Sequence, residues 1–244
     1  GEETGLLESL EGKKGMPRFK PPFPASYGLY GKPTLINNVE TIANLPPIIE
    51  KGAAWYRTLG TEKSPGVKIF SLSGHVNKPG NYELPFGTTY RELIYTHGGG
   101  VQDSRAVKAI MPAGASSSLI LVDDEKILDT QMDYATVRTI GGDLGSASVI
   151  VVDETVSIDW LINKTMHFFK HESCGKCTTC REGNHWMLNI LHRMDHQIKK
   201  DDVDLLYNVA KQMQGKCLCA LGEFSTMAVV SAIERFPEDF AVKA

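Results

Sequence analysis

The residues of this sequence most capable of chemistry are its five cysteines, all near the C-terminal end: Cys174, Cys177, Cys180, Cys217 and Cys219. The first three stand at three-residue intervals, which places three thiolates around one small volume. One of the two downstream cysteines can supply a fourth thiolate. Four thiolates in such an arrangement are the ligand set of a cubane 4Fe-4S cluster.

The number and placement of the cysteines argue against a disulfide framework. Such a framework would spread its cysteines through the fold and favour an even count. Residues 1–173 contain none, which fits a reduced compartment and a metal site. Structural zinc is the competing metal, because it commonly uses a Cys-x-x-Cys pair matched with a second ligand pair. The unbroken triplet favours the iron–sulfur cluster, and the spacing leaves Cys217 and Cys219 both open as the fourth ligand.

Four amphipathic helices, predicted between residues 156 and 240, would position these thiols. Their apolar residues recur at helical spacing, as in Ile158, Leu161 and Ile162, and the last helix is expected to begin after a Ser225 cap. The cysteine triplet falls between the first two helices, and the fourth cysteine falls between the last two. In an antiparallel bundle these two connections lie at the same end, so they can meet.

Charge and backbone groups around the triplet also suit a cluster. Lys176 and Arg181 are expected to offset the negative charge of four thiolates. Unpaired backbone N–H groups at a helix start can hydrogen-bond thiolates and cluster sulfides. The cysteine and proline that follow such a triplet in two-cluster ferredoxins are replaced here by Arg-Glu-Gly-Asn, so one cluster is indicated.

Residues 65–150 predict a small unit rich in β-strands. The segment Val67–Pro85 has the pattern of a hairpin around an Asn-Lys-Pro-Gly turn. Thr89 precedes Glu92 by the capping-box spacing, over a short helix. Three further strands are expected, at Lys108–Met111, near Leu119–Val122 and at Ser148–Val152. A hairpin, a helix and short strands in this order are typical of a ubiquitin-like β-grasp unit.

Residues 1–60 predict short helices separated by an extended segment. A helical pattern at Gly1–Leu10 is followed by Lys13–Pro24, whose prolines exclude a helix and a central strand. The pair Asn37–Asn38 suits a helix cap or a turn. A further helix is expected through Pro47–Leu59.

Composition excludes several classes of protein. The 244 residues are 42% hydrophobic and 23% charged, which is ordinary for a globular protein. A net charge of −3 gives no electrostatic case for nucleic-acid binding. No apolar run approaches the length of a membrane span, so direct membrane insertion is not expected.

The motifs together resemble one known family over the whole chain. The segment Glu172–Gly183 with Cys219–Gly222 is similar to the cluster motif of the flavoprotein subunit of respiratory complex I, the NADH-binding subunit of NADH–quinone oxidoreductase. Phe70–Gly80 resembles the SLBB module of that family. Three further segments resemble the flavin domain of that family: Gly1–Thr4, Phe19–Pro24 and Leu35–Thr41.

The resemblance implies an α+β chain in three parts. Residues 1–64 would be the end of an α/β FMN- and NADH-binding domain. Residues 65–153 would be the SLBB module, a ubiquitin-like β-grasp fold. Residues 154–244 would be an antiparallel four-helix bundle that binds the 4Fe-4S cluster.

The activity implied by the resemblance is electron input from NADH. NADH would reduce FMN by hydride transfer, and single electrons would pass to the 4Fe-4S cluster and on to partner subunits. Carried over by motif, the cluster ligands would be Cys174, Cys177, Cys180 and Cys219, because the fourth cysteine of the family precedes x-Leu-Gly. Leu221 would approach the flavin from the cluster side.

The resemblance also assigns residues to the FMN and NADH sites. Gly1, Glu2 and Glu3 would line the flavin, with Glu3 also facing the nicotinamide. Lys20 and Phe23 would border the dinucleotide, where Phe23 offers an aromatic face for stacking. The glycine-rich flavin loop and the acidic nucleotide-binding segment of the family should precede Gly1. The sequence given is therefore expected to hold only part of both sites and to bind neither cofactor tightly alone.

Three polar residues would complete the flavin site on this resemblance. Asn37, Asn38 and Thr41 would hold the phosphate or ribityl groups of FMN. Two positions depart from the family pattern. Thr179 stands where many members have proline, and Cys217 is an additional cysteine.

The family further implies a location, and two alternative functions stay open. The chain would be a peripheral arm subunit on the cytoplasmic side of the inner membrane, or in the mitochondrial matrix of a eukaryote, in contact with other iron–sulfur subunits. Diaphorase subunits of soluble NAD-linked hydrogenases and of formate dehydrogenases share every motif quoted. A non-catalytic SLBB interaction module with a structural metal is the third interpretation.

Overall fold

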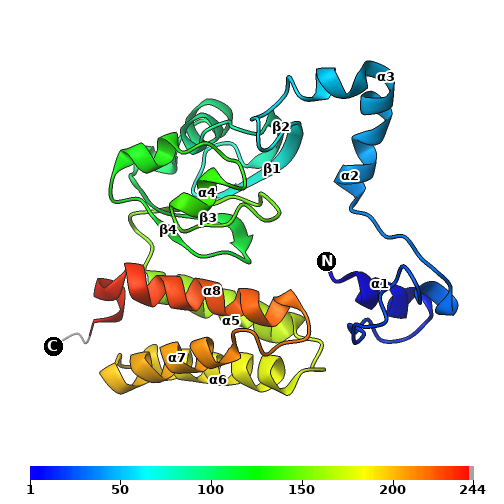
Figure 1. The fold of residues 1–244 in the computed structure, drawn as a ribbon. Helices are drawn as coiled ribbons and strands as arrows, with labels where there is room; N and C mark the ends of the chain where they lie inside the picture. Colours follow the sequence, from blue (N-terminus) through cyan, green and yellow to red (C-terminus); the bar gives the residue numbers. More distant parts are fainter. Residues whose placement is uncertain (242–244) are drawn as a thin grey trace.

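The computed structural model describes residues 1–241 of the chain. Helices and strands follow in this order: α1 (Glu3–Leu10), α2 (Val39–Ala43), α3 (Leu45–Tyr56), β1 (Val67–Gly74), β2 (Gly80–Pro85), β3 (Val107–Ala115), β4 (Ile120–Leu121), α4 (Thr136–Thr139), β5 (Ile150–Asp153), α5 (Ile158–Glu172), α6 (Thr178–Met194), α7 (Lys200–Met213) and α8 (Ala220–Arg235). Short turns of other helix types cover Leu29–Gly31, Glu92–His97, Gln102–Ser104, Glu125–Asp129 and Pro237–Phe240. Figure 1 shows an N-terminal arm, a sheet and a helical bundle.

The five-stranded sheet has the order β2-β1-β5-β3-β4. β1 and β2 pair antiparallel as the hairpin predicted from sequence, with Val67 opposite Pro85. β1 also pairs parallel with β5 in the centre, and β3 pairs antiparallel with both β5 and β4. This mixed order, with the first and last strands side by side, is the predicted β-grasp arrangement.

The short helix that packs on this sheet begins with the predicted capping box. The side chain of Glu92 accepts a hydrogen bond from the Thr89 backbone N–H at 2.8 Å, and Thr89 Oγ1 accepts one from the Glu92 N–H at 3.1 Å. These bonds satisfy backbone donors that a helix start leaves open. The helical turn is of the π type and ends at Gly98.

Both faces of strand β3 are buried, so this strand packs against the β-grasp core on one side and against the helical bundle on the other. Successive side chains of a strand point to opposite faces. Accordingly, Ile110 joins the core between the sheet and its own helix, whereas Ala109 and Met111 join the core of the bundle. The two units therefore share a continuous packed region, and the boundary predicted at residue 153 stays a prediction.

Helices α5 to α8 form the bundle predicted from the apolar periodicity. Each helix packs against its neighbours in the ring α5–α6–α7–α8–α5, and the core includes the fully buried Met166, Leu206 and Phe236. Within residues 1–241, no helix combines the length and the apolar character needed to cross a bilayer. Figure 1 shows the four helices grouped beneath the sheet.

The prediction for the start of the last helix is wrong. Helix α8 begins at Ala220 with Cys219 as its N-cap, so Ser225 lies inside the helix rather than before it. The Ser225 side chain is buried, and its hydroxyl donates to the Gly222 carbonyl at 2.8 Å. A serine can bond a preceding carbonyl within a helix, and the extended backbone of Cys219 is what ends the preceding loop.

The N-terminal arm, residues 1–60, contains helices α1, α2 and α3. Asn38 caps α2, as one of its two sequence interpretations predicted, because its side chain accepts from the Thr41 N–H at 3.2 Å. The helix expected through Pro47–Leu59 is present as α3, but it starts at Leu45 and is interrupted at Gly52, whose φ is +85°. A left-handed φ at this position is one that glycine adopts without strain.

Candidate metal centre

Two helix starts bring the cysteines to one end of the bundle. Cys177 is the N-cap of α6 and Cys219 is the N-cap of α8, while Cys180 lies in the first turn of α6. The two loops meet as predicted, because the Leu218 N–H donates to Cys177 Sγ at 3.3 Å. The N–H group of Leu218, in the loop just before the N-cap of α8, thus points toward a sulfur of the other cysteine loop.

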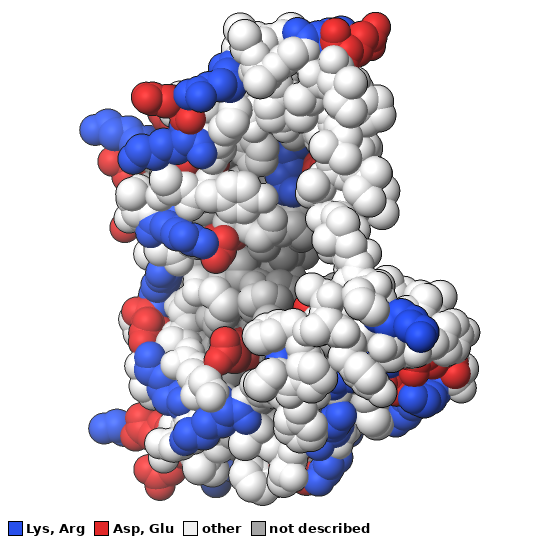
Figure 2. Space-filling model, turned by 45° about the vertical axis from the view of Figure 1, so that its right-hand side comes forward, with Lys and Arg blue, Asp and Glu red and all other residues white. Residues whose placement is uncertain are grey.

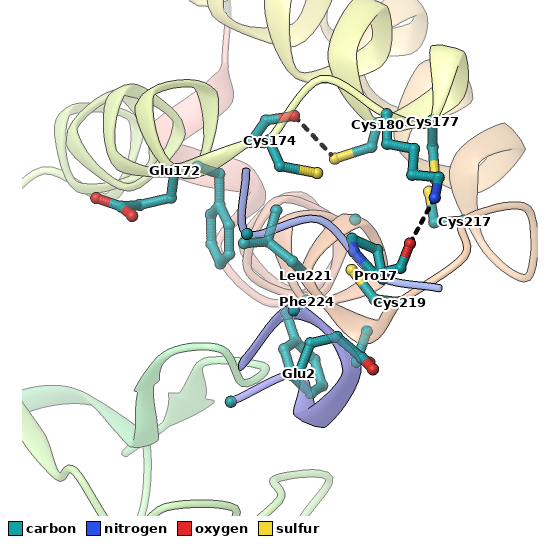
Figure 3. Close-up of a pocket in the computed structure, with 18 of the residues that line it drawn as sticks. Glu2, Pro17, Glu172, Cys174, Cys177, Cys180, Cys217, Cys219, Leu221 and Phe224 are labelled. Carbon is teal, nitrogen blue, oxygen red and sulfur yellow. Dashed lines mark hydrogen bonds between the residues drawn. The ribbon is translucent and has the colours of Figure 1, made fainter. Parts of the chain in front are cut away.

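All five cysteines line one cavity of about 770 Å³. Figure 3 shows their side chains around this space, with Glu2, Pro17 and Leu221 on its other walls. The five side chains are free thiols. Among the described residues, no three His, Cys, Asp or Glu side chains converge as a site for a single ion. The thiols surround a volume instead of a point, which fits a four-iron cluster that takes one cysteine per iron.

Cys180 is the most enclosed of the thiols, with 8% of its surface exposed. The Ser173 hydroxyl lies 3.3 Å from Cys180 Sγ, and Asn184 Nδ2 donates to the same sulfur at 3.3 Å. A dashed line in Figure 3 joins the Cys180 sulfur to the hydroxyl oxygen. Burial raises the pKa of the Cys180 thiol above its usual range, and neighbouring thiols add to this. Metal binding must therefore displace a firmly held proton.

Cys217 and Cys219 both line the cavity, so the choice of Cys219 as the fourth ligand stays a prediction. Cys217 Sγ lies 3.4 Å from Thr179 Oγ1. It also packs against Gly222, where an added Cβ would lie 2.4 Å from that sulfur. Gly222 therefore leaves the room that the additional thiol occupies.

The cysteine loop is tied to the N-terminal arm by Lys176. Its ammonium group donates to the Pro17 carbonyl at 2.6 Å and lies 5.1 Å from the centre of the Phe19 ring. Sequence reasoning missed this bridging contact, and the predicted role of Lys176 in offsetting thiolate charge stays a prediction. Arg181 donates to the Gly175 carbonyl and so closes the same loop.

Part of the predicted flavin and NADH site lies beside the thiols. Gly1, Glu2 and Leu221 line the cysteine cavity. Glu2 also caps α1, because its side chain accepts from the backbone N–H of Thr4 at 3.1 Å. Lys20 forms an ion pair with Glu3 at 2.8 Å and approaches Glu2 at 3.4 Å. The structure therefore places these charged residues next to each other.

The remaining residues predicted for the FMN and NADH sites lie elsewhere. Asn38 lines a second cavity, of about 850 Å³, between the arm and strand β1. Figure 2 shows the hollow between the arm and the rest of the molecule, with mostly uncharged walls. Asn37 and Thr41 are exposed beside Asn38, and Phe23 is 57% exposed on the arm. The roles of these four residues stay predictions.

Sequence reasoning missed two further groups of contacts. Lys68 is nearly buried and donates to Glu40 Oε2 at 2.8 Å, while Glu40 Oε1 accepts from the Ile69 N–H at 2.9 Å. This pair joins helix α2 to strand β1. The contacts of Ser173 and Asn184 with Cys180 were also missed, although Asn184 stands one helical turn after a cysteine, a spacing that places the two side chains on one face.

Two family models match the chain. The model of the NADH-ubiquinone oxidoreductase-F iron–sulfur binding region matches residues 160–243. The SLBB domain model matches residues 69–113. The first range contains the cysteine loops, and the second contains the β1–β2 hairpin except for the first two residues of β1.

Sequence relatives extend the match to the whole chain. The NADH-quinone oxidoreductase F-subunit of Rickettsia typhi is 46% identical over 241 residues, which is 98% of this chain. The chain is homologous to the F-subunit of NADH-quinone oxidoreductase. The F-subunit of Mycobacterium bovis is likewise 46% identical over 98% of this chain. The chain spans 56% of the length of the Rickettsia relative and 53% of the Mycobacterium one.

A solved structure matches the fold of this F-subunit homologue over the same extent. The crystal structure of an NAD+-reducing [NiFe]-hydrogenase in the H2-reduced state superposes with a TM-score of 0.87 at 31% identity. The match covers 98% of this chain and 40% of the hydrogenase chain. The resemblance inferred from the cysteine and SLBB motifs is thereby confirmed, as is the α+β fold class.

Proposed function

We propose that this chain belongs to the electron-input subunit of an NADH:quinone oxidoreductase. In this function NADH reduces FMN, and single electrons leave through a 4Fe-4S cluster to partner subunits. The observation that carries the proposal is the cavity in which five thiols, Glu2 and Leu221 meet. FMN would accept two electrons together and release them singly, and the cluster would carry one at a time.

The cysteine cavity supports the cluster half of this function. Cys174, Cys177, Cys180 and Cys219 would ligate the four irons, one thiolate each. The N–H group of Leu218 and the side chains around Cys180 hold the sulfurs in place. Because these hydrogen bonds already hold the sulfurs, binding of the cluster requires less ordering of the cysteine loops.

The residues at the arm side of the cavity would face the flavin and NADH. Leu221 lines the same cavity as the thiols and the arm residues, and its apolar side chain would keep water from the electron path. Gly1 offers no side chain at the cavity wall, so a flat ring can approach its backbone. The Glu2, Glu3 and Lys20 ion-pair group would fix the nicotinamide side through charge and hydrogen bonds.

The more distant residues would bind the ends of the two cofactors. Asn37, Asn38 and Thr41 would hold the phosphate or ribityl groups of FMN, and Phe23 would stack at the dinucleotide. The exposure of Phe23 leaves its ring face free for such stacking. The proposed partners are the iron–sulfur subunits of a peripheral arm at the inner membrane, on its cytoplasmic or matrix side.

The hydrogenase match favours a second candidate. A TM-score of 0.87 to an NAD+-reducing [NiFe]-hydrogenase supports a diaphorase subunit that performs the same chemistry for a different partner. The partners that co-purify with the chain distinguish the two, because a quinone-reducing complex and a hydrogenase differ in their remaining subunits.

Metal analysis of the purified protein tests the proposal. We expect about four irons and four acid-labile sulfides per chain, and an EPR signal that appears on reduction. Zinc without sulfide would contradict it and favour the SLBB module with a structural metal. Addition of NADH to the FMN-containing complex is expected to produce the same EPR signal.

A further inference from the structure

Asn184 occupies a position of helix α6 that its pattern reserves for apolar residues. The buried residues that follow on this face are Met187, Leu188 and Leu191. The Asn184 side chain is fully buried among them. A buried amide costs free energy relative to an apolar residue unless its polar atoms are bonded.

Only one end of this amide has a partner. Asn184 Nδ2 donates to Cys180 Sγ at 3.3 Å, whereas Oδ1 is buried without a hydrogen-bond partner among the described residues. The amide is therefore poorly explained as a contribution to the packing of the bundle. Its one bond is directed at a cysteine of the cluster cavity.

Cys180 receives a second donor from the loop before α6. Ser173 Oγ lies 3.3 Å from Cys180 Sγ, and the hydroxyl must be the donor once the sulfur is an iron-bound thiolate, which can only accept. Cys177 Sγ, by comparison, accepts a backbone bond from Leu218. Cys180 is thus the sulfur on which two side-chain donors converge.

We infer that Asn184 is a positioning residue that, together with Ser173, raises the reduction potential of the cluster through hydrogen bonds to Cys180 Sγ. The inference rests on the proposed function, because it requires a cluster on these thiols. Reduction adds negative charge to the cluster and its sulfurs. Donors to sulfur stabilise the charged, reduced state more than the oxidised state, and so they raise the potential.

The test is a redox titration of the cluster EPR signal in the purified complex. Asn184→Leu keeps the branched four-atom shape of the side chain, with larger terminal groups, and removes the donor. Asn184→Ala removes the donor with a smaller side chain in case Leu does not fit. Ser173→Ala removes the second donor. The matched control is Asn189→Leu, the same substitution at an exposed asparagine of the same helix.

We expect a shift of the midpoint potential to more negative values in each Asn184 variant and in Ser173→Ala, and a larger shift in the double variant. Iron and sulfide content should stay at the wild-type level. Unfolding by urea should need as much denaturant in Asn184→Leu as in wild type, or more, because the unbonded Oδ1 is gone. Asn189→Leu should leave the potential unchanged.

Two results would overturn the inference, and they differ from failure of the proposed function. Wild-type potential in the Asn184 variants, with a full cluster, shows that the amide does not act on the cluster. Reduced stability or cluster loss in both Asn184 variants, with no shift of potential in the fraction that retains cluster, shows a structural role. Absence of a cluster in the wild-type protein overturns the proposed function as well.

Discussion

The helical bundle buries most of its large apolar side chains, whereas the N-terminal arm leaves most of its own exposed. Leu206 and Phe236 of the bundle are 0% exposed, but Leu35, Val39 and Ile49 of the arm are 82–86% exposed. Burial of apolar surface is the main driving force of folding. The bundle is therefore stabilised by its own core, while the position of the arm depends on polar contacts.

Those polar contacts are few and specific. Arg18 holds the arm together internally, through ion pairs with Glu8 and Glu11 and a hydrogen bond to the Gly28 carbonyl at 3.0 Å. Glu40 of α2 joins the arm to Lys68 of β1. Lys176 holds the arm to the cysteine loop through the Pro17 carbonyl. The metal centre thus has a rigid side, which carries every thiol, and a side whose placement depends on hydrogen bonds and ion pairs.

The largest expected effect is loss of the cluster after a substitution on the thiol-bearing side of the metal centre. Cys180→Ala should lower the iron and sulfide content to background, because one iron of the cluster loses its ligand. Glu3→Gln, a change of the arm, should leave the content at the wild-type level. Full iron content in Cys180→Ala would show that the ligand set differs from the one proposed.

The same measurement identifies the fourth ligand. Cys219→Ala should lose the cluster, and Cys217→Ala should retain it. The reverse result would assign the ligand to Cys217, whose sulfur shares the cavity. Iron and sulfide analysis after anaerobic purification measures both variants.

A pair of core and surface substitutions compares the two regions directly. Phe236→Ala should lower the free energy of unfolding by about 3–5 kcal/mol, because the ring is fully buried. Ile49→Ala should change it by about 0.5 kcal/mol or less, since the side chain is exposed. Urea denaturation followed by circular dichroism measures both, and equal losses would contradict the comparison.

Removal of the hydrogen bond between the cysteine loop and the arm should have a smaller effect, on the attachment of the arm. Lys176→Met deletes the bond to Pro17 and should weaken the attachment of the arm by about 1 kcal/mol. Limited trypsin digestion should then cut the Lys13–Lys14 region several times faster. Lys176→Arg retains a donor and serves as the control, and an unchanged rate in Lys176→Met would show that other contacts hold the arm.

The smallest effect concerns acid pH. Hydrogen bonds from Lys13 and Arg18, and from the Tyr30 N–H, lower the pKa of Glu11 from 4.5 to about 2. A lowered pKa in the folded state means that these contacts stabilise the arm above pH 4.5, and that the stabilisation is lost as the pH falls toward 2. Trypsin is inactive there, so pepsin digestion between pH 4.5 and 2 is the measurement.

Glu11→Gln supplies the comparison for this pH effect. Its arm should be cut faster already at pH 4.5 and should show a smaller increase between pH 4.5 and 2. A wild-type arm whose cleavage follows only the intrinsic pH profile of pepsin, measured on an unstructured peptide, would contradict the assignment. The ion pairs of Arg18 would then contribute nothing measurable to the stability of the arm.

Local pattern was sufficient for the bundle and the hairpin but not for contacts between distant segments. Cysteine spacing predicted the metal site, and apolar periodicity predicted the four helices on which it stands. Ser225 was taken as a cap because serine is a strong capping residue, whereas the extended backbone at Cys219 decides where α8 begins. The bond between Lys176 and Pro17 joins segments remote in sequence, and no local periodicity encodes such a pair.

The arrangement of the cavity also constrains the order of its assembly. Gly1, Glu2 and Pro17, which form one wall, leave the ribosome long before the thiols that form the opposite wall. A wall closed first by Lys176 would obstruct the delivery of iron and sulfide. We therefore expect iron and sulfide to be inserted before the hydrogen bond between Lys176 and the Pro17 carbonyl forms, so that the arm closes over a finished cofactor.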